Sequence, residues 1–167
     1  MRRSLVLLSL IVFVLAFAGI SSADSRTANL QVTATVIGYC TVATTAVDFG
    51  SITGESTALA TGDVTVNCPL NTVYNITLDA GQHSSEGFRM ISGGGSGVSY
   101  NLYKDGSRSA EWGDNGYSGT YAAGTSLADM GTGSDQSHPV YGAIWGGFGG
   151  PAAGTVLTDT VLVTVYY

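Results

Sequence analysis

The sequence predicts an all-β protein, and in its simplest form an antiparallel β-sandwich. Apolar residues recur with a period of two, and turn residues separate these runs about every 8–12 residues. Beyond residue 23, no window of twelve residues has the apolar spacing of an amphipathic helix. The composition agrees, because 24 glycines and only 11% charged residues are atypical of a helical bundle or a coiled coil.

Residues 1–23 have the pattern of a secretory signal peptide. Arg2 and Arg3 precede the uncharged run 5–18, and the small residues Ser21, Ser22 and Ala23 follow. The alternative is a transmembrane anchor, but the apolar run is shorter than the roughly 20 residues that a bilayer requires. We therefore expect export and cleavage after Ala23.

Removal of this segment changes the charge of the protein. The remaining 144 residues carry 4 basic and 12 acidic side chains, which gives a net charge of −8. Such a charge disfavours binding to nucleic acid or to anionic lipid. The basic residues are also scattered, so we predict no nucleic-acid partner; they are Arg26, Arg89, Lys104 and Arg108.

The predicted strands follow one another without an interdomain linker, which indicates a single domain. In the first, residues 29–36, apolar and polar residues alternate strictly, as in a half-buried strand. Glycine-rich stretches at 93–97 and 146–154 are predicted loops. The other predicted strands are, in order, 64–66, 73–78, 88–91, 98–103, a weak strand within 119–127, 140–145 and 155–167.

The two cysteines, Cys40 and Cys68, both lie in the part of the chain that would be exported. In an oxidising compartment a single pair is most simply a disulfide. Its loop of about 29 residues would stabilise the fold by roughly 3.5 kcal/mol in the chain-entropy model. Metal ligation and a reactive thiol are the alternatives, although neither cysteine has a histidine or second cysteine at ligand spacing.

The two ends of the domain suggest a further possibility. Segment 29–36 precedes the first cysteine, and the strongly β-prone segment 161–167 is the last in the sequence. A free amphipathic strand at one end and an unpaired strand at the other would permit head-to-tail addition of strands between copies. Alternatively, 29–36 is the first strand of its own sheet; the pattern alone leaves both interpretations open.

An ordered set of short motifs resembles the spore coat protein U domain family, found in archaic chaperone-usher pilins. No single motif is specific, but the cysteine spacing, the order of the motifs and the aromatic terminal strand together carry the resemblance, which runs through nearly the whole chain after residue 23. Its motifs are Gly38-Tyr-Cys40-Thr-Val42, Asp48-Phe-Gly50, Val64-Thr-Val-Asn-Cys68, Tyr74-Asn-Ile-Thr-Leu-Asp-Ala-Gly81, Arg89-Met90, Tyr100-Asn-Leu-Tyr103, Trp112-Gly113, Val140-Tyr-Gly-Ala-Ile144, Ala153-Gly154 and Asp159-Thr-Val-Leu-Val-Thr-Val-Tyr166.

The resemblance implies an incomplete immunoglobulin-like β-sandwich that lacks its last strand and is completed by donor-strand exchange. A periplasmic chaperone would lend a strand, and an outer-membrane usher would replace it with the N-terminal segment of the next subunit. Residues 24–37 would then be the donor extension and 38–167 the pilin domain. Cys40 and Cys68 match the disulfide of the family. The implied donor-strand plugs are Leu30, Val32, Ala34 and Val36, and the implied groove-edge residues are Val161, Val163, Val165 and Tyr167.

Catalytic and metal-binding interpretations have weak support in the sequence. Neither His83 nor His138 accompanies a nucleophile elbow that leads into a helix, so we predict no enzyme and no cofactor. Acidic residues between glycines could bind calcium, although EF-hand spacing is absent and solvated turns are more common. These acidic residues are Asp105, Glu111, Asp114 and Asp129.

We therefore expect a structural subunit of a secreted surface fibre, either a pilus or a spore-coat-like layer that serves adhesion, biofilm or coating. Its partners would be identical or related subunits, a chaperone and an usher. The alternative is an adhesin or lectin-like domain of the same secretion system. Aromatic residues could line a sugar-binding surface, or could fill the core instead; they are Trp112, Tyr117, Tyr121, Trp145 and Phe148.

Overall fold

The computed structural model describes residues 26–35, 38–117, 119–149 and 151–167. The expected signal peptide and the plug residue Val36 lie outside the described residues. The chain divides into two units, residues 1–36 and 37–167. Within the first unit, residues 26–35 have no regular secondary structure, so the strand expected at 29–36 is not formed there.

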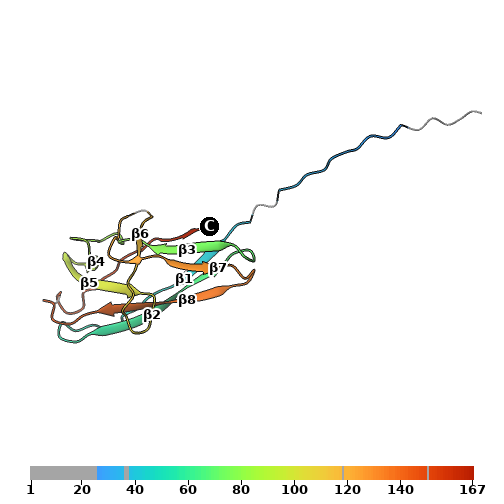
Figure 1. Cartoon of the computed structure of the whole chain (residues 1–167). Helices are drawn as coiled ribbons and strands as arrows, with labels where there is room; N and C mark the ends of the chain where they lie inside the picture. Colours follow the sequence, from blue (N-terminus) through green and yellow to red (C-terminus); the bar gives the residue numbers. More distant parts are fainter. Residues whose placement is uncertain (1–25, 36–37, 118, 150) are drawn as a thin grey trace, which may run out of the picture. The chain divides into compact units, whose positions relative to one another are not determined.

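The second unit is an immunoglobulin-like sandwich of two antiparallel sheets, as predicted. The larger sheet has the order β1-β2-β8-β5-β4 and the smaller has the order β7-β3-β9, and Figure 1 shows the two layers. The described residues contain no helix, and hence none long and apolar enough to cross a bilayer. The strands are β1 Thr41–Thr45, β2 Ala58–Asn67, β3 Val73–Leu78, β4 Arg89–Gly93, β5 Ser96–Tyr103, β6 Trp112–Asn115, β7 Leu127–Met130, β8 Gln136–Ile144 and β9 Val163–Tyr166.

The core forms because alternate residues of the strands face inward. Strands β2, β3, β5 and β8 each bury even-numbered apolar residues. Trp112 from β6 is fully buried, and its indole Nε1 donates a hydrogen bond to the carbonyl of Ile76 over 3.0 Å. The main buried apolar residues are Val64, Val66, Cys68, Tyr74, Ile76, Leu78, Val98, Tyr100, Leu102, Trp112, Val140 and Ile144.

Turn chemistry and proline position agree with the strand pairing. Gly94 and Gly95, between β4 and β5, have φ values of 58° and 81°, as a two-residue hairpin turn requires. Pro139 pairs with Asp63 of β2, whereas β5 pairs only with residues 141–143 of β8. A proline is tolerated in β8 because the strand has a single neighbour at that point.

Two of the strands expected after residue 37 were wrong in position or length, and two strands, β1 and β6, had not been expected. The segment 155–167 is a strand only at β9, because residues 158–162 follow an irregular path, in which they hydrogen-bond to Ser92 of β4, to the backbone of the loop after β3 and to the carboxylate of Asp79. The weak strand expected within 119–127 begins only at Leu127, since Asp114 binds the backbone of Thr120 and Tyr121. Strand β1 was not predicted; its small residues are all exposed along a sheet edge.

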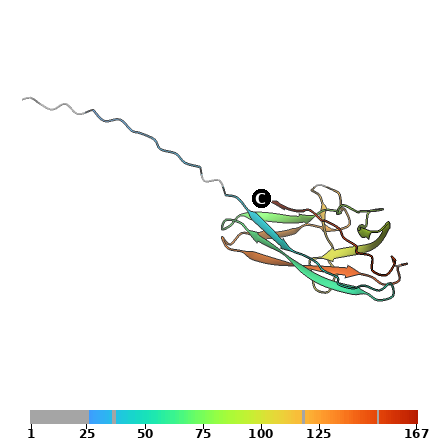
Figure 2. The same ribbon diagram turned by 180° about the vertical axis from the view of Figure 1, so that it is seen from behind.

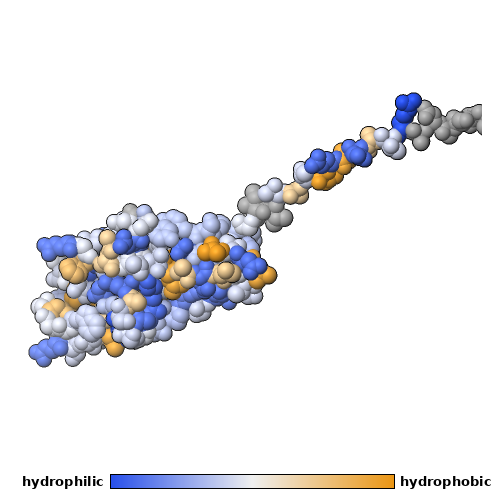
Figure 3. All heavy atoms as spheres, in the orientation of Figure 1, coloured by the Kyte–Doolittle hydropathy of each residue, from blue (hydrophilic) through white to orange (hydrophobic). Residues whose placement is uncertain are grey.

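One group of exposed apolar residues lies at an end of the sandwich. Figure 3 shows orange atoms over the end of the sandwich where Figure 1 places β7 and the neighbouring end of β3. Val73 and Met130 are register partners there and are 61% and 48% exposed. Much of the remaining visible face of the sandwich is coloured as polar or neutral (Figure 3).

Candidate functional site

One hollow of the sandwich is a groove of about 890 Å³. Residues 44–52, which include the end of β1 and the residues after it, border one side, and residues 151–163, which precede and enter β9, border the other. Residue 150 lies outside the described set. Core residues from β2, β3, β4, β5 and β8 form the floor; they are Val64, Leu78, Ile91, Tyr100, Leu102 and Val140. The groove therefore opens directly onto the hydrophobic core.

Both strands beside this groove are sheet edges. β1 is the outermost strand of the five-stranded sheet, and β9 pairs only with β3 in the smaller sheet. Figure 2 shows β1 alongside β2 when the sandwich is seen from behind. An edge strand presents backbone N–H and C=O groups to any strand that can lie beside it. The site therefore combines an apolar floor with an unpaired hydrogen-bonding edge at β9.

Partly buried apolar side chains from both borders face the core cluster. Gly142 lies beneath one border: a Cβ there would come 2.6 Å from Val47 Cγ1 and 2.8 Å from Phe49 Cζ. The absence of a side chain at residue 142 thus lets the border segment 44–52 lie close to β8. The partly buried apolar residues that line the groove are Val47, Phe49, Ile52, Ile91, Phe148, Leu157, Val161 and Val163.

The four residues expected at the groove edge have different environments. Val161 and Val163 line the groove, and Val165 packs against the core cluster further along β9. Tyr167 is 63% exposed and lies outside the groove lining. Among the expected plugs, Leu30 and Val32 are 88% and 82% exposed, and Ala34 is also exposed.

The border segment 44–52 was missed by sequence reasoning. Val47, Phe49 and Ile52 are separated by polar and glycine residues, so they resemble a loop and give only a short alternating signal. Their place at the groove comes from the pairing of β1 with β2, which carries the following residues across the sandwich.

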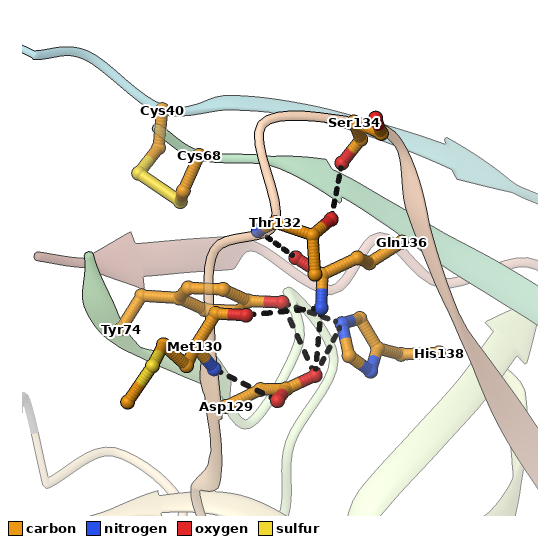
Figure 4. The surroundings of a disulfide bond; sticks show 9 residues. All are labelled: Cys40, Cys68, Tyr74, Asp129, Met130, Thr132, Ser134, Gln136 and His138. Atoms are coloured by element: carbon orange, nitrogen blue, oxygen red, sulfur yellow. Dashed lines mark hydrogen bonds and ion pairs between the residues drawn. A yellow bond between two sulfur atoms is a disulfide. The ribbon is translucent and has the colours of Figure 1, made fainter. Parts of the chain in front are cut away.

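The predicted disulfide between Cys40 and Cys68 is confirmed. It joins the residue before β1 to the residue after β2 and so secures the edge strand next to the groove. Figure 4 shows a polar cluster near this disulfide. Tyr74 Oη lies 2.9 Å from His138 Nε2 and donates to Asp129 Oδ2 over 3.4 Å.

This cluster connects the two sheets, because Tyr74 and Asp129 belong to the smaller sheet and His138 to the larger one. Gln136 Nε2 also donates to Asp129 Oδ2, over 3.2 Å. Burial, together with the charge and hydrogen bond of Asp129, raises the pKa of Tyr74 to about 12. The contacts of this histidine are thus those of a structural core residue.

The four acidic residues considered for calcium are not gathered into a site. Asp105 caps the turn at 107–110, Asp114 holds Thr120 and Tyr121, and Glu111 contacts Tyr121. Asp129 belongs to the cluster near the disulfide. Across the described ranges, no group of three His, Cys, Asp or Glu residues is placed to hold a metal ion.

The candidate aromatic residues are dispersed as well. Trp112 and Tyr121 are buried, and Phe148 lines the groove. Trp145 is 53% exposed, and Tyr117 stacks on Tyr166 with ring centroids 4.6 Å apart. The structure therefore brings these five residues to different parts of the sandwich.

Comparisons with known proteins agree with the fold. The family model described as Spore Coat Protein U domain matches residues 26–164, so this chain belongs to that family. A search of curated proteins found no match. Among eleven matching chains of solved structures is one from the CsuC-CsuE chaperone-tip adhesion subunit pre-assembly complex of the archaic chaperone-usher Csu pili of Acinetobacter baumannii.

The similarity to that structure is one of fold. Its TM-score is 0.57 and the sequence identity is 21%. The match covers 80% of the present chain but only 40% of the solved chain, so the present chain corresponds to less than half of that molecule.

Proposed function

From membership of the spore coat protein U domain family, we propose that this chain is a structural subunit of a secreted surface fibre. Copies would polymerise by donor-strand exchange, in which a segment of one subunit fills the groove of the next. The observation that carries this proposal is the apolar groove beside the edge strand β9. An immunoglobulin-like sandwich with such an opening is completed by one added strand.

The proposed occupant is the N-terminal extension, residues 24–37, of a second copy. Within it, Leu30, Val32 and Ala34 alternate with polar residues and are exposed, and Val36 continues the pattern in the sequence. Because strand side chains alternate between faces, these four would point together into the groove. Each would contribute roughly 1–3 kcal/mol when buried, and the backbone of β9 would supply a ladder of hydrogen bonds.

The proposed route of assembly passes through the periplasm to the cell surface. The similar solved complex contains a chaperone and a subunit of archaic chaperone-usher pili. By analogy, a periplasmic chaperone would occupy the groove before assembly, and an outer-membrane usher would catalyse the exchange. The Cys40–Cys68 disulfide is compatible with an oxidising compartment of this kind.

Deletion of residues 24–36 tests the proposal. The deleted chain, produced together with its chaperone and usher, should accumulate as a chaperone-bound monomer and form no fibres. Electron microscopy and native gels would report assembly. Normal fibres from the deleted chain would contradict the donor role of this extension.

A pair of point variants makes the test sharper. Val32→Asp would place a charge on the face that enters the groove, whereas Thr33→Asp would place the same charge on the opposite face. We expect Val32→Asp to abolish polymerisation and Thr33→Asp to preserve it. Equal loss of polymerisation in both variants would indicate that the added charge itself prevents assembly, whichever face of the extension carries it.

A further inference from the structure

Tyr100 contacts both borders of the groove. Its ring, 5% exposed on the groove floor, meets the ring of Phe49 edge-on with centroids 6.2 Å apart. Its hydroxyl donates a hydrogen bond to Asp159 Oδ2 over 2.6 Å. Phe49 belongs to border segment 44–52 and Asp159 to border segment 151–163, so one rigid side chain joins the two.

The carboxylate of Asp159 is itself held firmly. Its side chain is 2% exposed, and Oδ1 accepts hydrogen bonds from the backbone N–H groups of Gln82 and His83 over 2.9 and 3.2 Å. His83 Nδ1 lies 3.1 Å from the same oxygen. A buried carboxylate with several donors is fixed in position, because every alternative orientation would leave charge unsatisfied.

Gly81 makes room for this carboxylate. A Cβ at residue 81 would lie 2.1 Å from Asp159 Oδ2, and the φ of Gly81 is 78°. The local backbone is therefore shaped around Asp159, which is an observation independent of the hydrogen bonds.

The rest of border segment 151–163 is attached through its backbone, since the carbonyls of Thr160 and Leu162 accept hydrogen bonds from the N–H groups of Gln82 and Asp79, each over 3.1 Å. Thr158 forms an isolated bridge with Ser92, through hydrogen bonds of 2.9 and 3.0 Å. The Leu162 N–H donates to Asp79 Oδ1 over 2.8 Å. Between these two points, Val161 packs against the core cluster, and Asp159 is the residue whose side chain accepts a hydrogen bond from Tyr100 on the groove floor.

We propose that Phe49, Tyr100 and Asp159 form a cross-groove tie, which fixes the separation of the two border segments. The tie thereby limits the size of the donor side chain that the groove accepts at the point above Tyr100. Tyr100 and Asp159 are positioning residues in this inference, which rests on the proposed donor-strand exchange. It adds to that proposal a determinant of which donor strands the subunit accepts.

The test measures selectivity among donor peptides. A purified complex of the subunit with its chaperone is mixed with peptides of residues 26–36, in which each plug in turn is replaced by phenylalanine. For the wild type, we expect one of these peptides to exchange at least about tenfold more slowly than the unmodified peptide, since a fixed cavity rejects excess volume.

Two variants loosen the tie with little change in shape. Tyr100→Phe removes only the hydroxyl, and Asp159→Asn removes the charge and replaces one of the two acceptor oxygens with an NH2 donor. Both should reduce the discrimination against that peptide by at least about threefold. Tyr103→Phe is the matched control, because Tyr103 lies on the same strand but outside the groove lining, and it should leave the discrimination unchanged.

The outcomes separate the two proposals. A general loss of stability would alter the exchange of all peptides alike and leave their ratios unchanged, and this result would overturn the tie. The proposed tie would also be overturned if Tyr100→Phe and Asp159→Asn both kept the wild-type ratio of exchange rates between the substituted and the unmodified peptides. If the wild-type complex accepts no peptide at all, donor-strand exchange itself fails, and the tie fails with it.

Discussion

At the scale of single residues, a few buried polar side chains organise the sandwich. Arg89, Asp159 and Tyr74 are almost completely shielded from water, and each is surrounded by partners from other strands or loops. A buried polar group without partners would cost free energy. These residues therefore specify where loops and strands meet, which an apolar core alone would define less sharply.

Arg89 gives a prediction for stability. Its Nε and Nη2 donate to the carbonyls of Asp79 and Leu78, both over 2.8 Å, and its guanidinium lies 3.8 Å from the centre of the Tyr121 ring. Burial lowers its pKa. We expect Arg89→Met to lower the free energy of unfolding by about 2–4 kcal/mol, because two buried carbonyls lose their donors.

Urea denaturation of the mature chain measures this loss. Arg108→Met is the control, since Arg108 is only partly buried, and it should cost at most about 1 kcal/mol. A similar cost in both variants would mean that the surroundings of Arg89 rearrange to satisfy the carbonyls.

Tyr74 gives a prediction for alkaline pH. Its pKa rises from 10.0 to about 12 in the folded chain, so the fold favours the neutral phenol. The resulting stabilisation is complete below pH 10 and is lost as the pH rises from 10 to about 12. We expect the wild type to lose more stability across this range than Tyr74→Phe, which cannot ionise.

Urea titrations below and within this pH range would show the difference. Tyr100 and Tyr121 also have raised pKa values, chiefly through burial, so the decline should shrink in Tyr74→Phe without vanishing. Identical pH profiles for the two proteins would exclude a contribution from Tyr74.

At the scale of elements, the groove depends on where β1 ends. β1 pairs with β2 from Thr41 to Thr45, after which the chain crosses β2 at Gly62. A Cβ at residue 62 would lie 2.7 Å from the Thr45 carbonyl oxygen and 2.9 Å from that of Ala46. The backbone approaches this glycine so closely that border segment 44–52 can leave the sheet and line the groove.

Gly62→Ala tests this arrangement. We expect a loss of about 1–3 kcal/mol in the free energy of unfolding, together with weaker binding of a donor peptide, because the border segment must move. Gly149→Ala is the control, since a Cβ there would meet no atom within 4 Å. Thermal unfolding and peptide titration provide the two measurements, and an unchanged affinity in Gly62→Ala would contradict the role of this crossing.

At the scale of the whole molecule, each chain is proposed to carry one donor strand, its N-terminal extension, and one acceptor groove. Contacts of this head-to-tail type do not close, so identical copies continue into a fibre. The low charge content of the sequence, 11%, also limits repulsion between stacked subunits.

This polarity predicts how two defective chains behave together. Val32→Asp should donate no strand but keep its groove, and Leu157→Asp, with a charge in the groove lining, should accept none but keep its donor. Each alone should remain monomeric, and their mixture should yield one-to-one dimers by light scattering. Circular dichroism would show that both variants remain folded. Long polymers from the mixture would contradict the head-to-tail arrangement of donor strand and groove.

Much of the fold was predictable from the sequence, because period-two alternation directly reflects strands with one buried face. The segment 73–78 coincides with β3, and the strands that became β2, β4, β5 and β8 were located to within a few residues, except that β2 begins six residues earlier and β8 four. The error at 155–167 has a physical cause. Local β-propensity takes no account of hydrogen bonds to distant residues, and here the carboxylates of Asp79 and Asp159 accept bonds that hold residues 158–162 out of the sheet.

The sequence by itself determined the fold class and the alternating pattern of the extension, since both follow from local residue types. It also determined the disulfide partners, because the chain has only two cysteines. Only the tertiary structure decided the groove, because its border at 44–52 and its floor at Tyr100 come from segments that are distant in sequence. The tie from Phe49 through Tyr100 to Asp159 spans 110 residues of chain, from position 49 to position 159. Contacts over such separations depend on how the two sheets stack, which no local pattern encodes.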